Sequence, residues 1–369
     1  MDQLLNKSIK RNILLNPGPA TTTARVKSAL VVSDICPREK EFGDLVKTIR
    51  SNVLKVAKAN DNDYTAILLG GSGTAAVEAA ILNLSNATNK PILIIDNGAY
   101  GKRMKEICHV YHIAFESLDY SWGDPMSLAD LDDKLSSQKF GAVAWIHHET
   151  TTGILNPFSE VIEIAQNNNV LTLCDAMSSY GCLTIDLNAD KVDYLIASSN
   201  KGIHGFAGVG IVIAKKVVIE AAAKLPTKSY YLDLNRHAKQ FAADGQFPFT
   251  PPVQVLYAMD EALKETLEVT VSAREVHYKK MHEKLLNGMK ELGFKALVKE
   301  ALHSSVLTAF IEPDGFNFNE YHDYLYSKGM TVYPGKGAKE STFRIANMGD
   351  LTNADLDLLL LETANFLKK

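Results

Sequence analysis

Short runs of apolar residues alternate with helical patterns between residues 64 and 215. The runs contain few polar interruptions, as expected of strands that are buried on both faces of a sheet. Between them, residues 74–84 and 158–167 repeat apolar positions at helical spacing. This alternation predicts an α/β fold with a mostly parallel sheet covered by helices on both sides. The expected strands occupy residues 64–69, 91–95, 142–146, 171–174, 194–197 and 210–214.

The pattern changes near residue 252. Residues 253–266 and 273–292 have the apolar spacing of two amphipathic helices. A strand, a helix, two short strands and a final helix are expected to follow, and this order predicts a smaller α+β domain at the C-terminus. These elements are expected at residues 305–311, 318–328, 331–333, 342–346 and from 352 onward.

Two domains are therefore expected. We assign residues 16–255 to the large domain, and residues 1–15 together with 256–369 to the small one. The segment from Arg11 to Pro19 is apolar and then rich in turn residues. We expect it to cross between the two domains.

The composition is that of an ordinary soluble protein, with 46% hydrophobic and 22% charged residues. A formal net charge of −4 gives no electrostatic reason to expect binding to nucleic acid or to an anionic membrane. The four cysteines form no C-x-x-C pair, which favours buried free thiols in a reducing compartment. No signal peptide or transmembrane run is found, so we expect a cytoplasmic protein.

Lys201 is the most informative residue of the chain. It follows the apolar run that starts at Tyr194 and a stretch of small residues, and Gly202 comes next. Another apolar run ends in Asp175. An amine that can form a Schiff base and a carboxylate that can hold a pyridinium nitrogen are the minimal equipment for pyridoxal phosphate (PLP) chemistry. A surface lysine and a turn-capping aspartate are the alternatives for each residue alone.

A glycine-rich motif, Gly70-Gly-Ser-Gly-Thr-Ala-Ala, follows a strand and opens a helix. Ser72, Gly73 and Thr74 would present amides and hydroxyls to a phosphate at the helix N-terminus. The spacing also matches an NAD-binding turn, and Asp96 ends a strand about twenty residues later. The motif alone leaves PLP, NAD and a purely structural turn open. Its position, with about seventy residues before it, disfavours an NAD-dependent dehydrogenase.

Three further positions are candidates for a pocket. Tyr100 lies on a glycine-flanked loop after a strand, where its ring either stacks on a cofactor or is a half-buried loop residue. The hydroxyls of Thr150 to Thr152 are candidate donors to a cofactor or substrate oxygen. Arg344 interrupts an apolar strand, which indicates either a surface ion pair or a guanidinium that holds a carboxylate or phosphonate. His147 and His148 are neighbours on a strand and point to opposite faces, so no metal site is predicted.

The residues quoted so far, with several neighbouring motifs, resemble the class V, fold-type I PLP-dependent aminotransferases. The resemblance runs in order over nearly the whole chain, and its specific parts are Glu-Thr-Thr-Thr-Gly-x-Leu-Asn-Pro, Asp-Ala-Met-Ser-Ser and Cys36-Pro-Arg-Glu-Lys-Glu-Phe. The remaining motifs are Asn16-Pro-Gly-Pro-Ala-Thr-Thr-Thr, Gly71-Ser-Gly-Thr, Asn97-Gly-Ala-Tyr-Gly, Ser199-Asn-Lys-Gly, Phe249-Thr-Pro-Pro, Tyr333-Pro-Gly-Lys and Phe343-Arg-Ile.

The resemblance implies roles at matching positions. Lys201 would carry the cofactor, Asp175 would hold its ring nitrogen, and Tyr100 would stack on its ring. Thr152 would lie near the ring oxygen, and Arg344 would bind the acidic group of the substrate. The family's active site forms at a homodimer interface. The residues implied for the phosphate are Ser72, Gly73, Thr74, Ser199 and, from the neighbouring subunit, Thr250, and those implied for the substrate pocket also include Pro17, Gly18 and Pro19.

Within the family, the motifs are most similar to enzymes that transfer the amino group of 2-aminoethylphosphonate to pyruvate, giving phosphonoacetaldehyde and alanine. The substrates implied are thus a small amine donor and a 2-oxo acid. An alanine- or serine-glyoxylate aminotransferase and a PLP-binding regulator without activity are the alternatives with the same fold. Asn200, His204 and Phe206 depart from the family pattern and bear on substrate choice.

Overall fold

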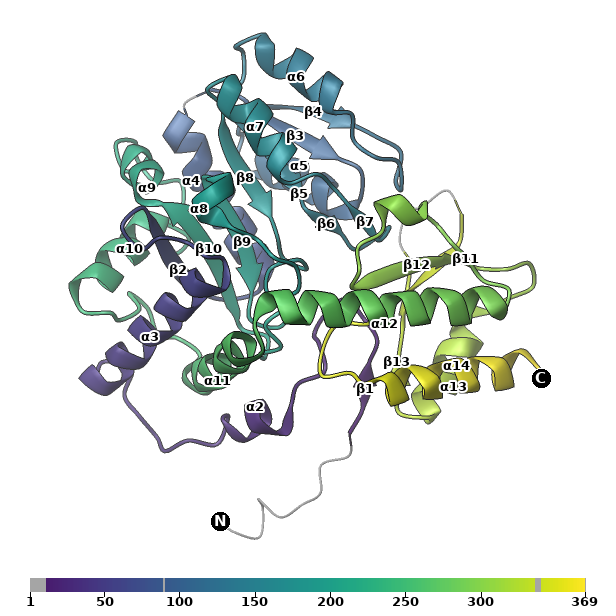
Figure 1. Ribbon diagram of the computed structural model, residues 1–369. Coiled ribbons are helices and arrows are strands. Elements are labelled where there is room, and N and C mark those ends of the chain that lie inside the picture. Colours follow the sequence, from purple (N-terminus) through teal and green to yellow (C-terminus); the bar gives the residue numbers. More distant parts are fainter. Residues whose placement is uncertain (1–10, 89, 336–339, 369) are drawn as a thin grey trace.

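A seven-stranded sheet forms the centre of the larger part of the molecule (Figure 1), in a computed structural model that describes residues 11–88, 90–335 and 340–368. All neighbouring strands are parallel except β10, which is antiparallel to both of its neighbours. The predicted α/β fold with a mostly parallel sheet is therefore confirmed. In spatial order the strands are β2 (Tyr64–Gly70), β10 (Val209–Lys215), β9 (Tyr194–Ser198), β8 (Leu171–Asp175), β5 (Ala142–Ile146), β3 (Ile92–Asp96) and β4 (Phe115–Asp119).

Helices cover both faces of this sheet, with α7 and α8 in front of it and α4 behind it in the view of Figure 1. The helices of this part are α3 (Lys40–Val56), α4 (Gly73–Thr88), α5 (Ala99–Val110), α6 (Leu128–Ser136), α7 (Ser159–Asn167), α8 (Leu187–Asp190), α9 (Lys216–Ala222), α10 (Leu234–Ala243) and α11 (Val253–Val269). Among them, α4, α7 and α11 are the helices that the apolar spacing of the sequence predicts. Strand β4 was missed because it is a half-buried edge strand without a continuous apolar run.

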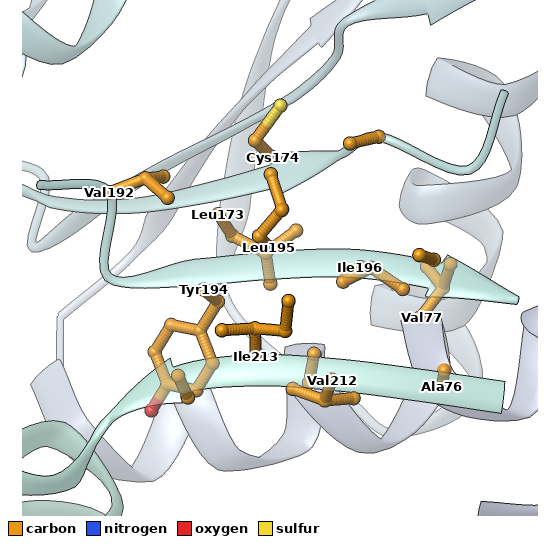
Figure 2. Packing of buried hydrophobic residues seen from close by; sticks show 14 of the residues in the cluster. Ala76, Val77, Leu173, Cys174, Val192, Tyr194, Leu195, Ile196, Val212 and Ile213 are labelled. Atoms are coloured by element: carbon orange, nitrogen blue, oxygen red, sulfur yellow. The ribbon is translucent and has the colours of Figure 1, made fainter. Parts of the chain in front are cut away.

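Buried apolar side chains pack closely between α4 and the strands β8, β9 and β10 (Figure 2). Ala76 and Val77 of α4 pack against apolar side chains of the three strands, among them Leu195 and Ile213, and all four are buried. Burying such side chains stabilises the fold by roughly 25 cal/mol for each Å² of apolar surface removed from water. The strands β8 and β9 run parallel, so their carboxyl ends lie at the same edge of this packed layer.

A second, four-stranded antiparallel sheet forms the smaller part. Its strands, in spatial order, are β11 (Lys295–Ala296), β12 (Leu307–Ile311), β15 (Thr342–Ala346) and β14 (Tyr333–Pro334). A core of apolar residues from this sheet packs against the helices around it, as the α+β prediction requires. These helices are α12 (Val271–Glu291), α13 (Phe318–Ser327) and α14 (Asn353–Leu367), and a 3-10 turn spans Glu300–Leu302.

The N-terminal segment connects the two sheets. Strand β1 (Ile13–Leu14) pairs in parallel with β13 (Met330–Thr331) beside the small sheet. A few residues later, the amide of Ala20 donates a hydrogen bond of 3.1 Å to the carbonyl of Asn200, next to Lys201. The predicted crossing is confirmed, and the short helix α2 (Ala24–Ser28) follows it. The domain boundary at residue 255 stays a prediction, and residues 1–10 of the small domain lie outside the described part.

The prediction that the cysteines are buried free thiols holds for three of the four. Cys108, Cys174 and Cys182 are buried free thiols, whereas Cys36 is exposed. In the described part of the chain, every helix is too short or too polar to cross a lipid bilayer.

Candidate active site

Lys201 follows β9, at the edge of the large sheet where β8 also ends. Its amine donates a hydrogen bond of 2.7 Å to the carbonyl of Pro17. Gly18 lies directly against the lysine, because a Cβ at this position would come within 2.3 Å of the Lys201 Cδ. Burial lowers the pKa of the Lys201 amine to about 8, although Asp175 opposes this shift. The fold thus brings the Pro17-Gly18-Pro19 turn into contact with Lys201.

Asp175 ends β8 and is almost fully buried. Its Oδ1 accepts a hydrogen bond of 2.8 Å from the amide of Met177. Burial raises the pKa of the carboxyl to about 6, while this hydrogen bond and the nearby charges of Arg103 and Lys201 lower it. Asp175 and Lys201 line the same cavity, so the structure brings the two residues of the initial hypothesis together.

The glycine-rich motif lines the same cavity at the N-terminus of α4. Ser72, Gly73 and Thr74 all face it. A Cβ at Gly73 would approach the Met177 sulfur to 2.5 Å, so a larger residue here would require the Met177 side chain to move. The first amides of a helix have no partner within the helix and carry its positive dipole end, which suits them to bind a phosphate.

Tyr100 lies in the first turn of α5 and lines the cavity. Arg103 stands one turn further along, with its guanidinium 4.8 Å from the centre of the Tyr100 ring. The same guanidinium donates a hydrogen bond of 3.3 Å to the Thr74 hydroxyl. Sequence reasoning missed Arg103, although its spacing of three residues from Tyr100 on one helix places both on one face.

Thr152 belongs to the turn between the short strands β6 (His148–Glu149) and β7 (Ile154–Leu155). It is fully buried, and its hydroxyl donates to the carbonyl of Glu149 at 3.4 Å. Thr152 is not among the described residues that line the cavity. The carboxylate of Glu149 accepts a hydrogen bond of 3.0 Å from the amide of Tyr100, a contact that the sequence did not suggest.

Arg344 projects from the middle of β15 and is 4% exposed, so it is not the surface residue that the alternative interpretation required. Its Nε donates to the carbonyl of Pro334 at 3.0 Å, and its Nη1 donates to that of Thr150 at 3.2 Å. It forms no salt bridge with a carboxylate among residues 11–88, 90–335 and 340–368. Burial lowers the pKa of Arg344, and its charge is close enough to lower the pKa of Lys201.

Two of the residues implied for the phosphate lie elsewhere. The hydroxyl of Ser199 contacts the carbonyl of Phe206 and accepts from the amide of Val209 at 3.3 Å, so it is turned away from the cavity. Ser198, one residue earlier, lines the cavity instead. Thr250 is exposed and does not line the cavity of its own chain.

The residues that depart from the family pattern have different surroundings. Asn200 lines the cavity, and its side-chain oxygen accepts a hydrogen bond of 3.0 Å from the Ser198 hydroxyl. His204 is buried and contacts Arg274 and Tyr278 of α12 rather than the cavity. Phe206 packs against a small apolar cluster of Val26, Ala258 and Ala262, so Asn200 is the one of the three departures that lines the cavity.

The two adjacent histidines also separate. The Nδ1 of His147 is 2.9 Å from the Ser179 hydroxyl, while His148 lines the cavity. Within the described ranges, no cluster of three histidine, cysteine, aspartate or glutamate side chains has the geometry of a metal site. Lys336 of the Tyr333-Pro-Gly-Lys motif lies outside these ranges.

Comparison with known proteins agrees with this arrangement. Residues 23–356 match the family model "Aminotransferase class-V". The chain is 37% identical over 357 residues to the 2-aminoethylphosphonate–pyruvate transaminase of Bacteroides fragilis, covering 95% of this chain and 98% of the relative. It is 38% identical over 359 residues to the protein of the same name from Klebsiella pneumoniae, covering 96% and 97%.

Solved structures show the same fold. The alanine–glyoxylate aminotransferase from Nostoc sp. superimposes with a TM-score of 0.90 at 26% identity, covering 98% of this chain and 97% of the other. The pyridoxamine-pyruvate aminotransferase from Mesorhizobium loti also has a TM-score of 0.90, at 18% identity, with 98% and 93% covered. The family match over most of the chain and the close relatives leave one assignment: the chain belongs to the class V aminotransferases.

Proposed function

We propose that this aminotransferase uses PLP to transfer the amino group of 2-aminoethylphosphonate to pyruvate, producing phosphonoacetaldehyde and alanine. The single observation that carries the proposal is the joint position of Lys201 and Asp175 in one cavity, with the buried charge of Arg344 beside it. Relatives with 37% and 38% identity carry the name of this activity.

The cavity residues suit PLP. Ser72, Gly73 and Thr74 at the start of α4 would hold its phosphate, and Asp175 at the end of β8 would face its ring nitrogen. Tyr100 would cover one face of the ring. When bound, PLP supplies an electron-accepting ring, which the side chains of a protein lack.

Lys201 has two tasks in this proposal. Its amine would hold the cofactor, and once a substrate amine had taken its place, the freed Nζ would be the group that moves a proton to and from the substrate carbon. A pKa of about 8 leaves a useful fraction of the amine unprotonated near neutral pH. The Pro17 carbonyl, at 2.7 Å, orients the amine until a ligand enters.

Arg344 would bind the acidic groups of both substrates. A guanidinium offers two parallel donors that fit either a carboxylate or a phosphonate. Only its Nε and Nη1 donate to backbone carbonyls, and it has no carboxylate partner in the described part of the chain. An incoming anion would therefore neutralise a buried charge, which favours binding.

The order of the strands argues against the NAD alternative. A dinucleotide fold needs two parallel neighbouring strands joined by the helix that follows the glycine motif. Here β2 lies at one edge of the sheet, and β10, β9, β8 and β5 separate it from β3. Asp96, the expected ribose ligand, is instead paired with Lys105 at 2.6 Å.

A shared active site in a cytoplasmic homodimer is part of the proposal. Thr250 is exposed and follows Phe249, which stacks on Tyr231 with ring centres 5.0 Å apart. The hydroxyl of Tyr231 donates in turn to the carbonyl of Gly70, beside the glycine motif. Thr250 therefore sits on a surface near the mouth of the phosphate site, where a second subunit would meet it.

A screen of amine donors tests the function. The purified protein with PLP is incubated with 2-aminoethylphosphonate, serine or alanine, each with pyruvate or glyoxylate as acceptor. We expect alanine to form from pyruvate with 2-aminoethylphosphonate at a kcat/KM at least about a hundredfold above that for serine, because an anion-binding pocket discriminates by charge and length. Preference for glyoxylate with alanine or serine would favour the alternative enzyme, and PLP binding without turnover of any pair would favour a regulator.

A further inference from the structure

Glu149 is a buried carboxylate that the proposed chemistry does not use. It is 0% exposed and lies at the end of the short strand β6. Burial raises the pKa of this carboxyl to about 7, and the charge of Asp175 adds to the shift. An acidic group is kept in such a place only if its hydrogen bonds offset the cost of removing it from water.

The hydrogen bonds of Glu149 reach the first turn of α5. The N-cap residue of this helix is Gly98, which has no side chain to cap the first amides. Two residues of another segment take its place: Oε2 of Glu149 accepts from the amide of Tyr100 at 3.0 Å, and the Thr151 hydroxyl accepts from the amide of Ala99 at 3.3 Å. A negative charge at a helix N-terminus also interacts favourably with the helix dipole.

The fit around the carboxylate is close. A Cβ at Gly98 would lie 2.3 Å from the Cγ and Cδ of Glu149, so the glycine leaves room for the carboxylate to approach the helix. The second oxygen, Oε1, accepts from the amide of Thr151 at 3.1 Å and from its hydroxyl at 2.6 Å. Both oxygens of Glu149 are therefore engaged by donors.

The same residue connects the α5 side of the cavity with Arg344. It holds Tyr100, the ring that carries the Arg103 guanidinium at 4.8 Å. Its neighbour Thr150 accepts the hydrogen bond from Arg344, and the Glu149 charge raises the pKa of that arginine against the effect of burial. A change in the position of Glu149 would therefore alter the positions of both the Tyr100 ring and the Arg344 guanidinium.

We propose that Glu149 is a positioning residue, which caps α5 from the β6–β7 hairpin and so fixes the Tyr100 ring over the cofactor and the backbone carbonyl that orients Arg344. The inference rests on PLP as the cofactor of the proposed function. It differs from a merely structural role because removing the carboxylate should alter how the cofactor is held more than how well the chain folds.

The test compares PLP binding to the apoproteins of the wild type, Glu149→Gln and Glu149→Ala. The measurements are the dissociation constant for PLP, the wavelength of its visible absorption band, and the melting temperature of each apoprotein. Because a charged group that accepts hydrogen bonds contributes more than a neutral one, we expect Glu149→Ala to weaken PLP binding by about tenfold or more and to shift the band. Glu149→Gln, whose amide retains one accepting oxygen, should bind PLP more weakly than the wild type and more tightly than Glu149→Ala.

Thr363→Val is the matched control. Thr363 is also fully buried and hydrogen-bonded, but it lies in α14 and contacts Tyr321 at 2.8 Å, away from the cavity. We expect this variant to lose melting temperature while its PLP affinity and absorption band stay at wild-type values. A wild-type affinity and band in Glu149→Gln and Glu149→Ala would overturn the proposal, as would a change in Thr363→Val as large as theirs.

The two proposals fail in different ways. A wild-type protein that does not bind PLP would refute the proposed function before any variant is measured. A wild type that binds PLP and transfers amino groups, with Glu149 variants indistinguishable from it, would refute the positioning role alone.

Discussion

The two sheets contribute to the active site in different ways. The large sheet supplies Asp175 and Lys201 from the carboxyl ends of neighbouring strands, where the chain leaves a closely packed layer. The small sheet supplies Arg344 from the middle of an antiparallel strand, with its side chain held by two backbone carbonyls. Carboxyl ends of parallel strands are the usual place for ligands in α/β folds, whereas a mid-strand arginine has no such general reason to be functional.

The balance of charge differs as well. On the side of the large sheet, the amine of Lys201 and the guanidinium of Arg103 are close enough to Asp175 to lower the pKa of its carboxyl. On the side of the small sheet, Arg344 has carbonyl partners but no carboxylate in salt-bridge contact within the described residues. The charge of Glu149 raises the pKa of Arg344 without a salt bridge between them, so an anion that bound the guanidinium directly would add an ion pair on this side. If the proposed roles hold, chemistry and substrate recognition come from separate parts of the chain.

The largest effect is expected from Lys201→Ala. Turnover should fall by at least about a thousandfold, because the variant loses both the covalent link to the cofactor and the group that moves the proton. The measurement is alanine formation from 2-aminoethylphosphonate and pyruvate, together with the visible absorption of bound PLP. Tyr64→Phe, a change in a buried hydroxyl that bonds to the carbonyl of Val192 at 2.9 Å, serves as the control for folding. A coloured Lys201→Ala variant with wild-type turnover would contradict the role of the lysine.

A smaller and more selective effect is expected from Arg344→Ala. The kcat/KM for both 2-aminoethylphosphonate and pyruvate should fall by about a hundredfold, because a charged, two-point contact with the anion is lost. PLP affinity should change much less, since Arg344 does not line the cofactor cavity.

The comparison of Arg344→Lys with Arg344→Ala sharpens this prediction. Lysine keeps the charge but not the planar fork, so it should restore only part of the loss. If Arg344→Ala lowered PLP affinity as strongly as it lowered kcat/KM, the proposal that Arg344 binds the substrate and not the cofactor would be wrong.

Much of the large domain was predictable because its strands are continuous apolar runs. Such runs are distinctive in sequence, and the residues that end them, Asp175 and Lys201, could be placed at one edge of a sheet without a structure. The half-buried strand β4 lacks this signal and was missed. The small domain followed from its change of periodicity near residue 252.

Contacts between distant segments could not be predicted in the same way. Glu149 caps a helix that starts some fifty residues earlier in the chain, and nothing local in the sequence indicates this partner. The family resemblance implied Ser199 for the phosphate, and only the geometry of the turn shows that Ser198 lines the cavity while the Ser199 hydroxyl contacts the carbonyl of Phe206. Strand register and side-chain direction depend on tertiary packing, so the local sequence pattern does not predict them.

The smallest effect concerns the pH dependence of cofactor capture, and it joins the two halves of the site. Burial and the charge of Arg344 both hold the pKa of Lys201 below its ordinary value of 10.5, at about 8. The neutral amine is the species that attacks PLP, so the rate of PLP uptake by the apoprotein should rise about tenfold per pH unit up to pH 8 and then level off. Stopped-flow absorbance between pH 6 and 10 measures this profile.

Removing the arginine should move that midpoint upward. In Arg344→Ala the amine no longer feels the nearby positive charge, so its pKa rises and a higher pH is needed for the same rate of PLP uptake. Lys328→Met is the control, because it removes a positive charge that lies outside the cavity and pairs with Glu362. An unchanged midpoint in Arg344→Ala would show that the small sheet binds substrate without influencing the lysine. A midpoint that rises only in Arg344→Ala would show that the recognition half of the site also adjusts the basicity of the group that performs the chemistry.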